Sequence, residues 1–126
     1  MPSNYKYSQE NLEAIRAFFE KTNLQNKAVL EFRDPSWWKS IKEIANTGIV
    51  FCSVNAPRLP HNLIPTNGVI YLRLHGSKDW YNYIYSEKEL DKILLEIKKL
   101  KANKKVIYLN NDHGMLENGL YLLKHI

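Results

Sequence analysis

Segments with helical periodicity alternate along this chain with short, almost continuously apolar segments, and this alternation limits the fold more than any other feature of the sequence. The clearest helix follows Ser86, which has capping-box spacing to Glu89 and precedes apolar residues three and four positions apart. The runs IVFCSVN and GVIYLRLH are typical of buried strands. The whole pattern predicts helices near residues 9–21, 35–47, 87–100 and 116–126, and strands at 27–33, 49–55, 68–75 and 106–110.

Helices that alternate with buried strands predict an α/β fold, in which helices cover a parallel sheet. Two architectures satisfy the order: an open doubly wound sheet and part of a β/α barrel. Residues 56–68 contain three prolines and no clear periodicity, so they predict a loop where a helix would otherwise separate two strands. The chain of 126 residues fits one domain, 1–126.

Composition narrows the class of protein. The chain is 44% hydrophobic and 25% charged, which is the balance of a globular protein rather than a disordered one. It has no apolar run near the roughly 20 residues that a bilayer requires and no apolar leader segment, so we expect no membrane partner and a cytoplasmic location. Cys52 lies among apolar neighbours and predicts a buried thiol.

The net charge of +5 has two interpretations, because much of the excess lies in residues 98–105 near a predicted helix end. Cations at a helix C-terminus complement the helix dipole, which explains the run without a partner. The alternative is a patch that contacts the phosphates of a nucleic acid. The first interpretation is favoured, because no recognisable nucleic-acid-binding motif accompanies the basic run.

All four predicted strands become polar at their carboxyl ends. Glu31 and Arg33 alternate with apolar residues in the first strand, and Arg73 and His75 do so in the third, so each pair shares one face. The other two strands end in Asn55 and in the run Asn110, Asn111 and Asp112. Parallel sheets and barrels bind their ligands at this edge. We therefore predict a shared pocket, at which these side chains converge: Glu31, Arg33, Arg73, His75 and Asn111.

The residue types at this edge suggest the ligand. Arg33 and Arg73 offer planar donor forks that match carboxylate and phosphate oxygens, so a small anionic or hydroxylated molecule is the leading ligand class. Glu31 has two interpretations, an ion pair that orders the pocket and a catalytic proton-transfer group. His75 is equally open between acid–base catalysis and a hydrogen-bonded structural role.

The amides and acids at the other strand ends are predicted ligand-binding groups: Asn55, Asn110, Asn111 and Asp112. For Asp112 a helix-capping role is favoured, because Gly114 and a helical run follow it. Glu31, His75, Asp112 and His113 are also metal-ligand types, but none of the short-spacing metal motifs occurs. We therefore predict no metal site, and the sequence names no cofactor.

Aromatic residues cluster in the segments that follow the first and third strands: Trp37, Trp38, Trp80, Tyr81, Tyr83 and Tyr85. Such residues stack on bases or sugars in some proteins, whereas in connecting segments they more often fix loops against helices. Packing is the favoured interpretation. Trp80 and Tyr81 are the best candidates for pocket walls.

Three motifs in this order, EFRDPSWW, YLRLHGSKDWYNYIYSEKEL and YLNNDHG, resemble the second half of the YecE-like family, also known as domain of unknown function 72. Members of that family resemble triosephosphate-isomerase-type barrels, so the resemblance implies that these strands are the later strands of a barrel and that their polar ends line its mouth. The family has no established activity. The segment for the earlier strands is absent, and Asn55 stands where family members often have an acidic residue.

Half of a barrel leaves two unpaired sheet edges, so we expect self-association or pairing with a chain that carries the missing half. The exposed apolar groups should include Val50, Val69, Tyr71 or their neighbours in the same strands. Three functions stay open: a barrel rim that binds an anionic metabolite with Glu31 or His75 moving a proton, a non-enzymatic module that binds nucleic acid or protein, and a truncated family member without its own activity.

Overall fold

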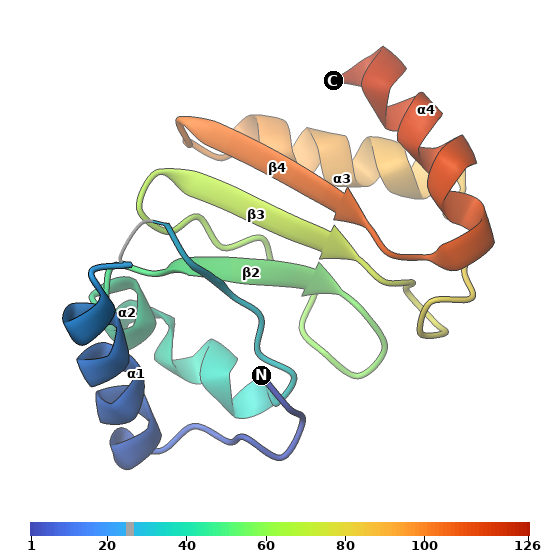
Figure 1. Ribbon diagram of the computed structural model, residues 1–126. Helices are drawn as coiled ribbons and strands as arrows, with labels where there is room; N and C mark the ends of the chain where they lie inside the picture. Colours follow the sequence, from blue (N-terminus) through green and yellow to red (C-terminus); the bar gives the residue numbers. More distant parts are fainter. Residues whose placement is uncertain (25–26) are drawn as a thin grey trace.

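A four-stranded parallel sheet forms the centre of the protein (Figure 1). The computed structural model describes residues 1–24 and 27–126. The strands lie side by side in chain order: β1 (Val29–Leu30), β2 (Val50–Asn55), β3 (Val69–Leu74) and β4 (Lys104–Leu109). The predicted α/β class, with a parallel sheet like that in part of a β/α barrel, is confirmed.

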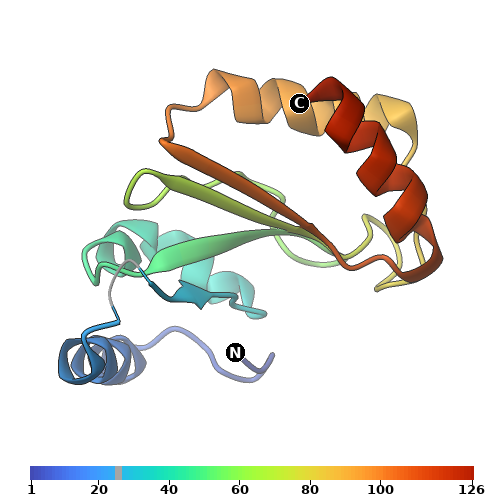
Figure 2. The same ribbon diagram turned by 45° about the horizontal axis from the view of Figure 1, so that its top comes forward.

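Helices pack against this sheet in two groups, one over its first two strands and one over its last two (Figure 2). The first group packs on β1 and β2 and comprises α1 (Gln9–Thr22), a 3₁₀ helix (Pro35–Ser40) and α2 (Ile41–Ala45). The second packs on β3 and β4 and comprises α3 (Glu87–Lys99) and α4 (Met115–His125), the latter preceded by a 3₁₀ turn (Asp112–Gly114). No helix within 1–24 or 27–126 is long and apolar enough to cross a membrane.

The α3 helix begins as its sequence predicts. The Ser86 hydroxyl accepts a hydrogen bond from the Glu89 amide, and the Glu89 carboxylate accepts one from the Ser86 amide at 2.9 Å. These two bonds satisfy backbone donors that the helix itself leaves unpaired. Leu90, Leu94 and Ile97 of α3 are then buried in a cluster with the even-numbered leucines of β3.

The helix predicted over 35–47 is divided in two. Asp34 caps its start as expected, since its side chain accepts from the Ser36 amide at 2.9 Å. The first turns form a 3₁₀ helix, and Ser40 interrupts the run with φ −119° and ψ 29° before α2 begins. Trp37 anchors this segment, because it is fully buried and stacks on Phe32 with 4.2 Å between ring centroids.

The pleat of the strands separates two faces of the sheet. Leu72 and Leu74 point to the helices, whereas Tyr71 and Arg73 lie on the opposite side, which we call the open face. Parallel pairing places Cys52 beside Tyr71 and Tyr108 beside Arg73, so all of these residues share the open face. This alternation assigns the candidate-site residues in the strands and directly after them to one side of the sheet.

One residue expected among the exposed apolar groups is buried. On the open face Val50 is buried, and the more exposed residues are Val29, at 39%, and Tyr108, at 53%. The apolar stripe of the closing helix does not face the sheet, because α4 buries Asn118 and Leu122 instead. Asn118 fixes this orientation through hydrogen bonds to the Tyr85 backbone, and the stripe is left 51–78% exposed: Leu116, Leu120, Leu123 and Ile126.

Candidate functional site

Three donor side chains converge on the carboxylate of Glu31 at the carboxyl edge of the open face. Arg33 donates through Nε to Oε1 of Glu31 at 3.1 Å, and Arg73 donates through Nη1 to Oε2 at 2.7 Å. Nε2 of His75 lies 3.3 Å from the same Oε2. Glu31 and Arg33 follow β1 directly, and the other two residues come from β3 and the position after it. Four of the five side chains expected to converge therefore do so.

Asn110 orders the histidine of this cluster. Its side-chain amide donates to Nδ1 of His75 at 3.1 Å, so the ring proton lies on Nε2 and is donated to Glu31. His75 has no solvent-exposed surface. The register of β4, which pairs Tyr108 with Arg73, puts Asn110 on the open face two residues further along.

The environment of Glu31 keeps its carboxylate ionised. Burial alone raises its pKa, but the hydrogen bonds from His75 and Arg73 and the charge of Arg73 outweigh burial and lower the pKa to about 2. The thiol of Cys52 lies 4.0 Å from the same carboxylate. Burial, followed by the charge of Glu31, raises the pKa of that thiol to about 12, so the predicted buried thiol is confirmed and stays protonated.

Trp80 and Tyr81 form an aromatic wall beside the cluster. The Arg33 guanidinium lies 5.4 Å from the centre of the Trp80 ring, and its Nη2 donates to the Tyr81 hydroxyl at 3.4 Å. The His75 ring lies 5.2 Å from that of Trp80 and 5.5 Å from that of Tyr81. The two residues chosen as pocket walls are thus in contact with the charged residues.

Gly76 makes the turn that brings this wall back to the sheet. Its φ is 123°, which side chains rarely allow, and a Cβ there would lie 2.1 Å from the Asp79 carbonyl oxygen. The loop is closed by the Tyr81 amide, which donates to the His75 carbonyl at 2.7 Å. Glycine is therefore required at this position by both conformation and space.

Both arginines of the cluster remain accessible to a ligand. Their side chains are 36% exposed at Arg33 and 32% at Arg73, whereas the Glu31 side chain is only 11% exposed. The cluster of one carboxylate and two guanidinium groups has one net positive charge. An enclosed anion that holds two accessible cations in place is an arrangement suited to a further anion.

Asn55 lies on the other side of the same edge. It pairs with Leu74, so its side chain is on the helix-covered face. Its Oδ1 accepts from the Tyr85 hydroxyl at 2.8 Å and from the Ser77 hydroxyl at 2.9 Å. Asn55, predicted as a ligand-binding group, therefore does not lie beside the arginines, because the pleat directs its side chain to the other face.

Asn111 is also directed away from the pocket, which corrects the fifth member of the expected set. It is fully buried, and its side-chain amide donates to the Tyr83 carbonyl at 2.7 Å and to Oδ1 of Asn118 at 2.9 Å. The reason is again the pleat, because Asn111 follows Asn110 directly and points to the opposite side.

Asp112 is an exposed residue with φ 47° in the 3₁₀ turn that precedes α4. It neither joins the cluster nor caps α4, whose N-cap is Gly114 without a side-chain cap bond. Its left-handed conformation shapes the turn, a conformation that Asp tolerates better than most residues. The favoured capping role is therefore wrong.

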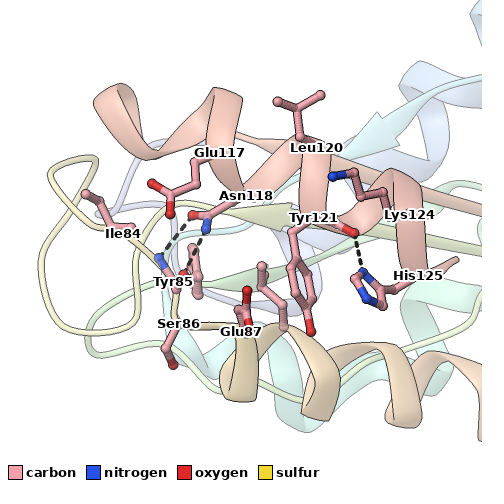
Figure 3. Close-up of a pocket in the computed structure, with 11 residues that line it drawn as sticks. Ile84, Tyr85, Ser86, Glu87, Glu117, Asn118, Leu120, Tyr121, Lys124 and His125 are labelled. Atoms are coloured by element: carbon pink, nitrogen blue, oxygen red, sulfur yellow. Dashed lines mark hydrogen bonds between the residues drawn. The ribbon is translucent and has the colours of Figure 1, made fainter.

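The sequence did not single out Asn118, which holds the helix-covered side together. Its Oδ1 accepts from the Tyr85 amide at 3.0 Å and its Nδ2 donates to the Tyr85 carbonyl at 2.8 Å (Figure 3). The available signal is a polar residue one helical turn before Leu122, inside the helix predicted over 116–126.

A cavity of about 780 Å³ opens beside this amide, between the start of α3 and α4 (Figure 3). Its walls include Glu87, Tyr121 and Lys124, so it lies on the helix-covered side and is separate from the Glu31 cluster. Within the described residues, no three His, Cys, Asp or Glu side chains form a group that could hold a metal ion.

Comparisons with known proteins agree with the fold of this chain. A family model described as "Protein of unknown function DUF72" matches residues 1–120. A DUF72 family protein from Thermotoga maritima MSB8 is 25% identical with a TM-score of 0.79, over 99% of this chain and 55% of that one.

A DUF72 family protein from Enterococcus faecalis V583 has the same fold in two structures. One gives a TM-score of 0.76 at 20% identity, over 98% of this chain and 55% of that chain. The other gives 0.71 at 22% identity, over 99% and 58%. This chain therefore spans little more than half the length of these solved relatives. No curated protein matches it.

Proposed function

Because this chain belongs to the DUF72 family, a family of unknown function, we propose from its own residues that it binds a small anionic molecule at the carboxyl edge of the open face. The observation that supports this most strongly is the pair Arg33 and Arg73, held on either side of one carboxylate. The shared chemistry of the ligand is a carboxylate or phosphate group, which a guanidinium contacts with two parallel hydrogen bonds.

The donors that this ligand needs are present in the two guanidinium groups. Among the described contacts, Arg73 uses one nitrogen for Glu31, and Arg33 uses one for Glu31 and one for Tyr81. Each guanidinium has five N–H donors, so each retains donors beyond those bonds. Glu31 limits the freedom of both arginines, which lowers the entropy that a ligand must remove on binding.

We assign Glu31 and His75 a positioning role in this site. A general base works best with a pKa near the working pH, whereas the pKa of Glu31 is lowered to about 2. Both ring nitrogens of His75 already have partners, and its side chain is enclosed. A proton-transfer role for either residue is the alternative, and it would require that residue to exchange these partners during the reaction.

A thermal-shift screen with phosphorylated and carboxylated metabolites tests the proposal. A ligand at about ten times its Kd stabilises the folded state by about 1.4 kcal/mol, which raises the melting temperature by several degrees. Arg73→Gln should abolish this shift, because glutamine keeps a donor for Glu31 but not the guanidinium fork.

The matched control is Arg58→Gln, which removes an exposed arginine from the loop after β2. Its thermal shift should equal that of the parent. If no anion stabilises the parent, or if Arg73→Gln responds like the parent, the proposed site is wrong.

A further inference from the structure

The outer face of α4 carries an apolar stripe that nothing in the described structure covers. Leu116 is 75% exposed, Leu120 is 51% exposed and Leu123 is 78% exposed. The steps of four and three residues between them place these leucines in one line along the helix. Isolated exposed leucines are ordinary, but a continuous line of them marks an interaction surface.

This stripe points away from the sheet. The residues that α4 buries are Asn118 and Leu122, which lie on the other side of the helix, and Figure 3 shows Leu120 pointing away from α3. A strand added beside β4 would meet a groove of about 410 Å³ whose walls include Leu109, Leu123 and Ile126, so it reaches only one end of the stripe. Extension of the sheet alone would therefore leave Leu116 and Leu120 uncovered.

The charged residues beside the stripe identify what fits it. Glu117 and Lys124 lie seven residues apart on the same flank of α4, one near each end of the stripe. If a second α4 packs antiparallel to the first, its Lys124 lies opposite Glu117 and its Glu117 lies opposite Lys124. Leu116 then meets Leu123 of the second copy, and the two Leu120 side chains meet near the two-fold axis.

We propose that the outer face of α4 is a self-association surface, on which a second copy of this chain packs its own α4 in the antiparallel direction. One surface is sufficient for this contact, because a two-fold axis pairs the same patch with itself. The leucines supply the apolar centre, and the two Glu117–Lys124 pairs fix the direction. In a two-fold parallel packing this flank of each helix would instead face the opposite flank of the other, so the two Glu117–Lys124 pairs would not form.

Sedimentation equilibrium of the full chain over a wide range of concentration tests this surface. The parent should shift reversibly from one chain to two as concentration rises. Leu120→Glu should weaken the dimer by on the order of tenfold or more, because it puts two carboxylates at the apolar centre. The control Leu95→Glu, at a leucine that is 57% exposed on α3, should leave the dimer unchanged.

Charge reversal tests the antiparallel direction separately. Glu117→Lys and Lys124→Glu should each weaken the dimer by about threefold to tenfold, and the double variant should restore it. Circular dichroism checks that each variant is folded, and if Leu120→Glu is not, Leu123→Gln replaces it. Four results would overturn the proposal. The parent could stay monomeric, or Leu120→Glu or Leu123→Gln could leave the dimer intact. Leu95→Glu could also break the dimer, or the double charge reversal could fail to restore association.

Discussion

The two sides of the carboxyl edge of the sheet use similar residue types for different purposes. On the open face, Glu31 contacts two arginines that remain about one-third exposed. On the helix-covered face, Asn111 and Asn118 are enclosed, with exposures of 0% and 2%, and hydrogen-bond each other and the backbone. The first side leaves charged donors accessible to solvent, whereas the second uses neutral groups to hold its own segments together.

The boundary between these sides falls between two consecutive residues. Asn110 donates to His75 on the open face, and Asn111 donates to the Tyr83 carbonyl on the other. The same residue type thus contributes to a candidate binding site in one position and to the scaffold in the next. Substitutions of the open-face arginines should change anion binding, and substitutions of the covered-face asparagines should change stability.

The largest effect on stability should come from the covered face, at Asn118. Asn118→Leu would leave the Tyr85 amide and carbonyl and the Asn111 amide without their partner. Unpaired buried groups cost 1–3 kcal/mol each in other proteins, so we expect a loss of about 3 kcal/mol in the free energy of unfolding. Urea denaturation of the parent and of Asn118→Leu measures this loss.

The control for this change is Asn82→Ala, an exposed asparagine in the loop before α3, which should cost less than about 0.5 kcal/mol. At temperatures where Asn118→Leu is folded, its affinity for phosphate should equal that of the parent. A large loss of affinity without a loss of stability would reverse the roles assigned to the two faces.

A smaller effect on the free energy of unfolding, which depends on pH, is expected at Glu31. The pKa of Glu31 is lowered from 4.5 to about 2 in the folded state, so its contribution to stability is complete above about pH 5 and is lost as the pH falls towards 2. Allowing for solvent screening, the contribution is about 2 kcal/mol. Urea denaturation from pH 6 to pH 2 should show this fall in the parent.

Glu31→Gln should lack that part of the pH dependence and be less stable than the parent at neutral pH, because two arginines lose their shared anion. The matched comparison is Glu13→Gln, on the exposed surface of α1. Equal pH profiles for the parent and Glu31→Gln would show that the carboxylate is not held as the geometry indicates.

The smallest effect on stability and on anion affinity should come from a change in the aromatic wall of Trp80 and Tyr81. The hydrogen bond from Arg33 to the Tyr81 hydroxyl is long, at 3.4 Å, so Tyr81→Phe should change stability by no more than about 0.5 kcal/mol and anion affinity by about twofold. Calorimetric titration and urea denaturation measure the two quantities. An effect on affinity as large as that of Arg73→Gln would mean that Tyr81 contacts the ligand itself.

The sequence predicted the fold well because alternating periodicities determine it. Each helix and strand was placed by a local signal, such as the cap at Ser86 or the apolar run of β2. The division of residues 35–47 at Ser40 has no such signal in the sequence.

The sequence predicted the candidate-site residues correctly in β3, where polar and apolar residues alternate. Arg73 and His75 are separated by Leu74, and so their shared face is visible in the sequence. In β2 every position from Val50 to Val54 is buried, so the pattern does not show on which side Asn55 lies. The sequence predicts both Asn110 and Asn111 as ligand-binding groups and places Asn111 in the shared pocket. The pairing of Tyr108 with Arg73, which the sequence does not show, sets the alternation of β4 and puts Asn110 on that face instead.

Calorimetric titration with inorganic phosphate and with succinate, at low ionic strength, tests the central claim most directly. The account predicts that the parent binds at least one of the two anions, that Arg33→Gln binds it at least about tenfold more weakly, and that Arg58→Gln binds it like the parent. If the parent binds neither anion, or if all three proteins bind equally well, the arginines around Glu31 are not an anion-binding site.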